Sequence, residues 1–210
     1  GWISPKAMRN GIIITVLFAC LIGSSLLFYA GWELIIVGLL CVLFAFLYTT
    51  GPYPLSYNGW GDILVIVFFG FVPVGGTYYV QALTWTTDTT IASLICGLLI
   101  DTLLVVNNYR DREADARSGK RTVIVRFGEK FGSYLYLMLG MTASLLCFWF
   151  LFEGHLYAAL LPLLYLIPHF LTWKRMVRIH SGKKLNSILG ETSRNMLLMG
   201  ILLSIGFFLN

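Results

Sequence analysis

Long apolar runs alternate with short polar segments along the whole chain. A helix that crosses a bilayer needs about 20 consecutive, predominantly apolar residues, and seven runs come close to that length. The pattern therefore predicts an all-α, polytopic transmembrane helical bundle formed by a single domain over residues 1–210. The predicted spans are 11–30, 33–50, 62–82, 90–106, 133–152, 156–173 and 195–209.

Two of the predicted spans carry local signals of their own. Ser4 and Pro5 precede the first span as an N-cap and a first-turn proline would, and they predict a short amphipathic lead-in helix. Gly70, Pro73 and Gly75 lie inside the third span and predict a break in that helix. Broken helices allow the backbone to line a cavity within a membrane protein.

Composition supports a membrane protein and excludes other classes. Hydrophobic residues make up 58% of the chain and charged residues 12%, whereas soluble proteins carry about 25% charged residues. The formal net charge is +5, but the Lys and Arg residues lie in short segments between apolar runs rather than on a folded basic face. We therefore expect the lipid bilayer as a partner and no nucleic acid.

The distribution of charge indicates the topology. If the seven spans alternate in direction, all 15 Lys and Arg residues fall on one side, while the opposite connections hold only Glu33, Asp88 and Glu153 as charged residues. By the positive-inside rule the basic side is cytoplasmic, and the C-terminus lies outside. We expect an integral protein of a bacterial inner membrane whose polar loops face the cytoplasm.

The polar stretch 107–132 is the strongest candidate for chemistry, with eleven charged residues. Asp111 and Asp115 stand four residues apart, so on a helix their side chains share one face. If the helix of the fourth span continues past its apolar part, four polar residues fall within an arc of about 80°. They are Asp101, Asn108, Asp111 and Asp115.

Two carboxylates beside cations suit the binding of a metal and a phosphate. Mg²⁺ is held in proteins by one or two carboxylates, and water and substrate phosphates take its other coordination positions. Lys120 and Arg121 follow the acidic pair, and Gly119 permits a turn that brings them back over it. An acid inside an apolar span is costly unless it faces protein or water, so we expect Asp101 to face inward.

An alternative role for the acidic pair is purely structural. Asp111 and Asp115 would then form ion pairs on the helix surface with Arg112 and Arg117, and the loop would serve only to set topology.

The stretch from Asn107 to Thr122 reads N-N-Y-R-D-x-x-x-D-x-x-x-G-K-R-T and resembles the second aspartate motif of the UbiA superfamily of intramembrane prenyltransferases. Together with Val125–Gly128 and Gly51-Pro52-x-Pro54, it is most similar to the branch that prenylates 1,4-dihydroxy-2-naphthoate in menaquinone synthesis. The likeness extends over essentially the whole chain.

The resemblance implies nine transmembrane helices around a central cavity and two aspartate motifs that face each other across it. Seven spans and one motif are present here. Because the chain opens with Gly1-Trp2-Ile3 rather than Met, we expect two further helices and an N-D-x-x-D motif upstream, and we expect residues 1–210 alone to be inactive.

The resemblance also implies an activity: Mg²⁺-dependent transfer of a polyprenyl group from polyprenyl diphosphate to an aromatic acid. Asp111 and Asp115 would hold the metal, Lys120 would act with them in catalysis, and Asp101 would support them. The residues expected to bind substrate are Tyr48, Asn107, Asn108, Arg110 and Arg121.

Two other functions remain as alternatives. The first is prenylation of another aromatic acceptor, such as 4-hydroxybenzoate or homogentisate, against which the N-N-Y-R-D variant argues. The second is a secondary transporter without enzymatic activity, because transporters also place acids in broken helices. A transporter would not need the Asp-x-x-x-Asp pair beside Gly-Lys-Arg, and no repeated half is visible in the sequence.

Overall fold

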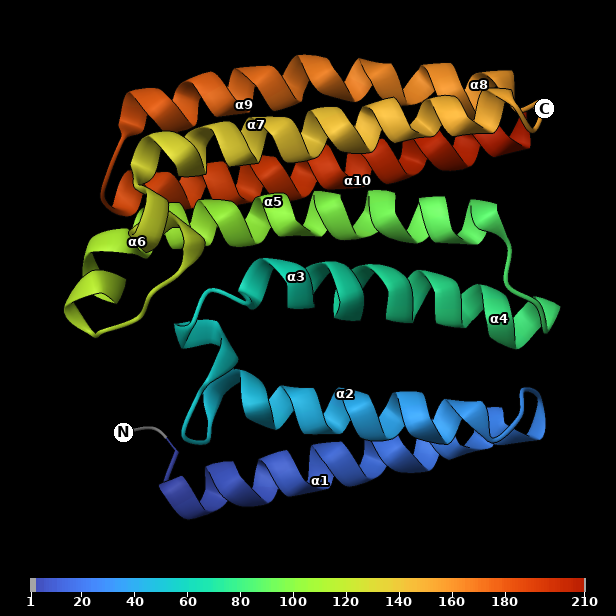
Figure 1. Ribbon diagram of the computed structural model, residues 1–210, viewed down its shortest axis with the longest axis horizontal. Helices are drawn as coiled ribbons and strands as arrows, with labels where there is room; N and C mark the ends of the chain where they lie inside the picture. Colours follow the sequence, from blue (N-terminus) through green and yellow to red (C-terminus); the bar gives the residue numbers. More distant parts are fainter. Residues whose placement is uncertain (1–2, 210) are drawn as a thin grey trace.

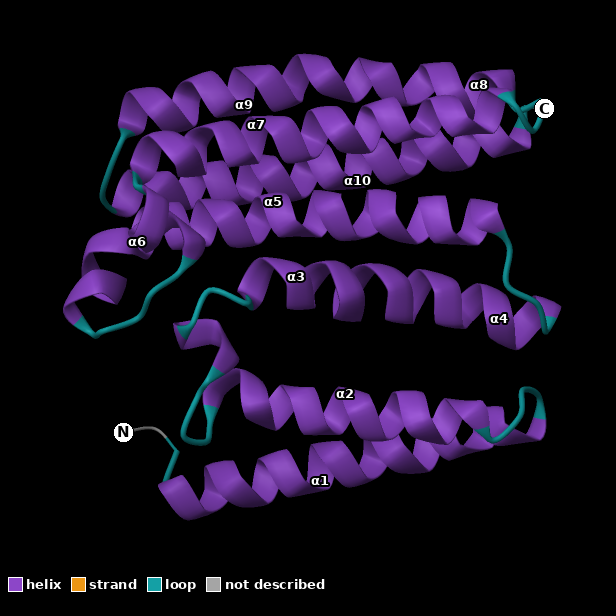
Figure 2. Ribbon diagram, in the orientation of Figure 1, coloured by secondary structure: helices purple, strands orange, loops and turns teal. Residues whose placement is uncertain are grey.

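Seven helical segments run up and down beside one another in the computed structural model, which describes residues 3–209 (Figure 1). Helices and loops make up all of these residues, so the predicted all-α fold is confirmed (Figure 2). In chain order the elements are α1 (Pro5–Ser24), η1 (Ser25–Phe28), α2 (Glu33–Thr49), η2 (Leu55–Tyr57), α3 (Gly61–Val65), η3 (Ile66–Gly75), α4 (Gly76–Ala82), α5 (Thr87–Arg117), α6 (Val123–Phe127), α7 (Glu129–Leu146), η4 (Cys147–Leu151), α8 (Leu156–Leu160), η5 (Leu161–Tyr165), α9 (Leu166–Ile179), η6 (Lys183–Leu185) and α10 (Asn186–Phe208).

Each predicted span falls in one of these segments, and four of the spans extend one or two residues past its C-terminal end. In the described part of the chain, six segments are long and apolar enough to cross a membrane, and the other apolar helix, Glu33–Thr49, has 17 residues. The protein is therefore an integral membrane protein. The expectations about the two ends of the chain concerned residues outside the described range, namely Gly1, Trp2 and Asn210.

The prediction of a separate lead-in helix before the first span is wrong. The Ser4 side chain accepts a hydrogen bond from the Ala7 backbone N–H at 3.2 Å, with Pro5 in the first turn, so the N-cap is where the sequence placed it. The helix then continues into the apolar run without interruption, because nothing between Pro5 and residue 11 ends it.

The third span is continuous rather than broken. Its middle part, Ile66–Gly75, is a π-helix with Pro73 inside it, and its wider turn accommodates a residue that has no backbone N–H. Gly70 packs against α5 there: a Cβ atom on Gly70 would lie 2.7 Å from the Cα atom of Gly97. The glycines thus serve close helix packing.

The buried core surrounds α5, which packs against η3, α7 and α10. Val105 and Val106 of α5, Tyr136 of α7 and Met199 of α10 are all fully buried. In contrast, α1 and α2 have no buried residue, and their side chains form an apolar surface of the kind that lipid or another helix contacts.

The basic connections lie at one end of the bundle. Figure 1 shows the start of α1, the loop around α6 and the connection from α9 to α10 together at this end, whereas the end of α10 lies at the other. The alternation that placed all Lys and Arg residues on one side is therefore confirmed.

Candidate functional site

The candidate site is built on α5, a helix of 31 residues. At 1.5 Å per residue it is about 46 Å long, longer than the roughly 30 Å hydrocarbon core of a bilayer. Thr86 caps its N-terminus by accepting a hydrogen bond from the Thr89 N–H at 3.1 Å. The predicted extension of the helix beyond span 90–106 is confirmed, and it places Asp111 and Asp115 on its last turns.

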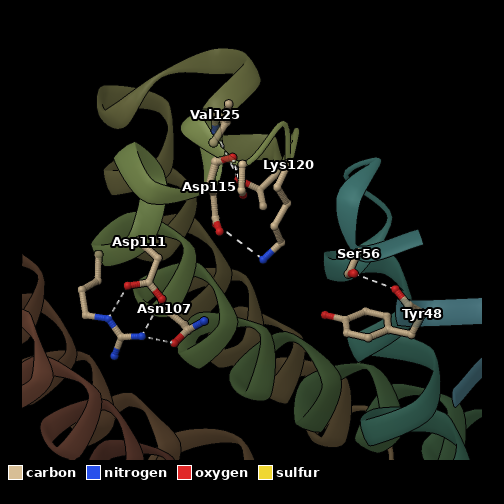
Figure 3. Close-up of polar contacts among 10 residues, drawn as sticks. Tyr48, Ser56, Asn107, Asp111, Asp115, Lys120 and Val125 are labelled. Atoms are coloured by element: carbon tan, nitrogen blue, oxygen red, sulfur yellow. Dashed lines mark hydrogen bonds and ion pairs between the residues drawn. The ribbon is translucent and has the colours of Figure 1, made fainter. Parts of the chain in front are cut away.

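Arg110 organises the first half of the site. Its guanidinium donates to both carboxylate oxygens of Asp111, at 2.7 and 2.6 Å, and to the Asn107 side-chain oxygen at 2.7 Å (Figure 3). It also reaches α10, where it donates to Asn186 Oδ1 at 2.9 Å. These hydrogen bonds lower the pKa of Asp111, which lies beyond the membrane-spanning segment 90–106. Asp111 is therefore held in its charged form.

Asp115 and Lys120 form the second half. Helix α5 ends at Arg117 with Ser118 as its C-cap, and Gly119 takes a positive φ of 77°, a conformation that favours glycine. The chain turns back, so that the Lys120 backbone N–H donates to the Asp115 carbonyl at 2.9 Å. The Lys120 ammonium then lies 3.5 Å from the Asp115 carboxylate. The turn that the sequence predicted is confirmed.

The ion pairs differ from those of the structural alternative. Asp111 pairs with Arg110, and Asp115 with Lys120. Arg112 instead binds Glu129 of α7 at 2.8 Å and donates to the His180 carbonyl at 3.0 Å. Arg112 therefore joins α5 to the start of α7 and the end of α9. The acidic pair interacts instead with cations suited to phosphate.

Tyr48 approaches from the end of α2. Ser56 donates a hydrogen bond to the Tyr48 carbonyl at 2.6 Å, which holds the start of η2 against the end of α2. Figure 3 shows the Tyr48 phenol directed toward α5, with the Lys120 ammonium on the same side. The Arg121 backbone N–H donates to the Tyr57 carbonyl at 2.7 Å. This hydrogen bond joins η2 to the loop that follows α5, and the two together form one side of the site.

The remaining predicted residues lie deeper. Asn108 and Asp101 are buried on α5, with 4% and 1% of their surfaces exposed. Asp101 precedes Asp111 by ten residues, which is about 15 Å along the helix axis. The structure therefore places Asp101 away from the Asp111 and Asp115 carboxylates.

The fit of a divalent metal rests on the chemistry of Asp111 and Asp115. Residues 3–209 contain no group of three His, Cys, Asp or Glu side chains able to hold a metal ion. Mg²⁺, however, is commonly held by only one or two carboxylates together with substrate phosphates and water. The pair fits such a site, with the phosphates supplying part of the ligand set.

An apolar groove begins at the polar site. It has a volume of about 460 Å³ and lies between η3, α5 and α10, lined by Phe69, Ile100 and Leu103 among others. Asn107 also lines it, and the same side chain accepts a hydrogen bond from Arg110. Polar and apolar binding surfaces are therefore continuous.

Three residues of the region escaped sequence reasoning. Asn186 binds Arg110 from a distance of 76 positions in the chain. Arg126 donates to the backbone carbonyls of Arg121 and Asn58, and so anchors the loop. Asp62 lies in the first turn of α3, where acidic residues are common. Only its position near the buried Asp101 distinguishes it from other such residues.

Comparison with known proteins finds a family and several relatives for this chain. The model of the UbiA prenyltransferase family matches residues 1–206. A 1,4-dihydroxy-2-naphthoate octaprenyltransferase of Escherichia coli is 33% identical over 100% of this chain and 70% of its own length. One of Mycobacterium tuberculosis is 37% identical over 69% of this chain and 50% of its own length. No solved structure matches.

Proposed function

The chain belongs to the UbiA prenyltransferase family, and we propose that it transfers a polyprenyl group from polyprenyl diphosphate to 1,4-dihydroxy-2-naphthoate. The product is of the demethylmenaquinone type, an intermediate of menaquinone synthesis. The names of the relatives from E. coli and M. tuberculosis support this choice of acceptor, and the two acidic residues on α5 support the choice of a diphosphate donor.

One observation carries the proposal: Asn107 belongs both to the polar cluster and to the apolar groove. A polyprenyl diphosphate has a highly charged head joined directly to a long apolar tail. A site that binds it must change from polar to apolar within one residue's length, as this site does at Asn107. The groove then receives the tail without the cost of transferring apolar surface into water.

The cations of the site bind and orient the diphosphate. Lys120 and Arg110 carry N–H donors that can move from the aspartates to phosphate oxygens. Bound Mg²⁺, for which Asp111 and Asp115 are the ligands available in this chain, would neutralise charge on the diphosphate and make it a better leaving group.

The reaction joins two carbon atoms. The C–O bond between the prenyl group and the diphosphate breaks, and the allylic carbon forms a bond to the electron-rich naphthoate ring. The ring carboxylate leaves as CO₂, so the aromatic ring is restored and diphosphate is released. The apolar surroundings exclude water, which would otherwise capture the allylic cation.

We also propose a location in a bacterial inner membrane, with the site at the cytoplasmic end of the bundle. The gathering of basic connections at the end that carries Asp111 supports this orientation.

Incubation of membranes that contain the full-length protein with polyprenyl diphosphate and a panel of aromatic acids tests the proposal. We expect a prenylated product from 1,4-dihydroxy-2-naphthoate, dependent on Mg²⁺ and abolished by a chelator. Preferential prenylation of 4-hydroxybenzoate or homogentisate would contradict the proposed acceptor, whereas metal-independent transfer would contradict the role of the aspartates.

A further inference from the structure

We propose that Asp62 and Asp101, together with the hydroxyl group of Tyr48, bind the free ring hydroxyl of the aromatic acceptor. The proposal rests on the proposed function and deepens it, because it names residues that select the acceptor. These three side chains meet where α2, α3 and α5 approach one another, below the diphosphate end of the site.

Asp101 is the first observation. Only 1% of its surface is exposed, and its Oδ1 atom is buried without a hydrogen-bond partner in the described part of the chain. A buried carboxyl oxygen without a partner is strongly unfavourable, and more so inside a membrane helix. Such an atom indicates a ligand that supplies the missing donor.

Asp62 and Tyr48 are the second observation. Leu104 lies one helical turn from Asp101 on α5, and its Cδ2 atom lies 3.3 Å from the position of a Cβ atom on Gly61 of α3. The Tyr48 hydroxyl lies 3.5 Å from the position of a Cβ atom on Gly61, next to Asp62. Three polar side chains from three helices therefore surround one place.

The charges around this place decide the class of ligand. Within residues 3–209, no Lys, Arg or His nitrogen lies within 4.0 Å of either carboxylate as an ion-pair partner, and no third acid, His or Cys joins them in a metal-binding group. Two acids without a cation beside them disfavour an anionic ligand. A neutral hydroxyl, which donates a hydrogen bond without bringing charge, is the ligand that suits them.

The place also lies where the acceptor ring must be. Asp101 is about 15 Å along α5 from Asp111, so the pair of acids and the diphosphate site lie at two levels of one helix. Val65 and Leu104, each three residues beyond one of the acids, line the apolar groove. An aromatic ring bound beside Asp101 contacts the groove and lies between the two acids and the diphosphate site.

Charge then orients the acceptor. The acids repel the carboxylate of 1,4-dihydroxy-2-naphthoate, so the ring binds with that carboxylate directed away from them. The 1-hydroxyl is adjacent to that carboxylate and forms an internal hydrogen bond to it. The 4-hydroxyl is therefore the group left to donate to Asp62 and Asp101.

Binding measurements on the protein in nanodiscs test the proposal with two probes, 1,4-dihydroxy-2-naphthoate and 1-hydroxy-2-naphthoate, which lacks the 4-hydroxyl. We expect the wild type to bind the dihydroxy compound at least tenfold more tightly. Asp62→Asn, Asp101→Asn and Tyr48→Phe should reduce this preference to less than threefold, whereas Glu33→Gln, at the other end of α2, should preserve it. Binding of farnesyl diphosphate should change less than twofold in all variants.

The outcomes separate this inference from the proposed function. Equal affinity of the wild type for the two naphthoates would overturn the inference even if every variant failed to fold, and it would leave the proposed function standing. Equal loss of both naphthoates and of the diphosphate in Asp101→Asn would also overturn it, since the role would then be structural. If the wild type binds neither naphthoate, the proposed function fails with it.

Discussion

Asp111 and Asp115 are balanced by cations in different ways. The guanidinium of Arg110 meets both oxygens of Asp111, and the side chain of Asp111 is 38% exposed. Asp115 is 14% exposed and has a single ammonium at 3.5 Å. Bidentate pairs are stronger than long single contacts, so the Asp115 carboxylate is the more readily available of the two.

Replacement of either aspartate by Asn removes a charge with almost no change in size. We expect Asp111→Asn and Asp115→Asn to lower turnover by about 100-fold or more, because electrostatic stabilisation of the leaving group is lost. Product formation in membranes measures this. Glu113→Gln is the matched control on the exposed face of the same helix, and near-normal turnover of both aspartate variants would contradict the site.

Lys120 is expected to act on the donor rather than on the acceptor. Lys120→Met keeps the side-chain length and removes the charge, so the KM for polyprenyl diphosphate should rise about tenfold, the value of one charge-assisted hydrogen bond. The acceptor KM should change little, and Lys130→Met, an exposed residue of α7, should change neither. A selective rise in the acceptor KM would argue against contact with phosphate.

At this scale the sequence predicts part of the site. Gly119 followed by Lys120 and Arg121 correctly indicates a returning turn, because a positive φ at glycine is a local property. The Arg110–Asp111 pair does not follow from spacing, since adjacent residues on a helix point about 100° apart. The long guanidinium curls back to Asp111 because Asn186, from a distant helix, fixes its other end.

Among the elements, η3 and α5 pack closely against each other. A Cβ atom on Gly97 would lie 2.9 Å from the Cα atom of Ile66, and one on Gly70 would press on the backbone of α5. Glycine and proline in the third span predict a break when read alone. In the structure, the proline is accommodated in the wider turn of a π-helix, and Gly70 allows close packing against α5. Neither follows from the local sequence, because both depend on the neighbouring helix.

The crossing gives a stability prediction. Gly70→Ala should destabilise the protein by about 1–3 kcal/mol, since backbone atoms of α5 cannot move aside cheaply. Gly76→Ala should be tolerated, because a Cβ atom there would have no neighbour within 4 Å. Thermal denaturation in detergent compares the two variants, and equal melting temperatures would contradict the packing.

The whole molecule is ordered by the alternation of its segments. The spans and the partition of charge were predictable because seven apolar runs and one-sided Lys and Arg residues are global patterns that local errors do not disturb. The start of the last span was not: the helix begins at Asn186, nine residues before the predicted 195. The polar side chains in its first turns contact other helices. For example, the hydroxyl groups of Thr192 and Tyr136 form a hydrogen bond of 3.1 Å.

Topology is tested by labelling single cysteines in a variant that lacks the native ones. Ser181→Cys, in the basic connection before α10, should react with an impermeant maleimide only from the cytoplasmic face. Glu153→Cys, in the opposite connection, should react only from outside. Labelling of both from one face would mean that a segment between them does not cross the membrane.

Because α5 is one uninterrupted helix, the separation between its two polar levels is set by residue number alone. One residue inserted between Asp101 and Asn107 would lengthen the helix by about 1.5 Å and rotate one level by about 100° relative to the other. Seven inserted residues would nearly restore the orientation but add about 10.5 Å. The separation between the acid at Asp101 and the diphosphate site is therefore encoded as a count of residues, and softening of the surrounding loops leaves it unchanged.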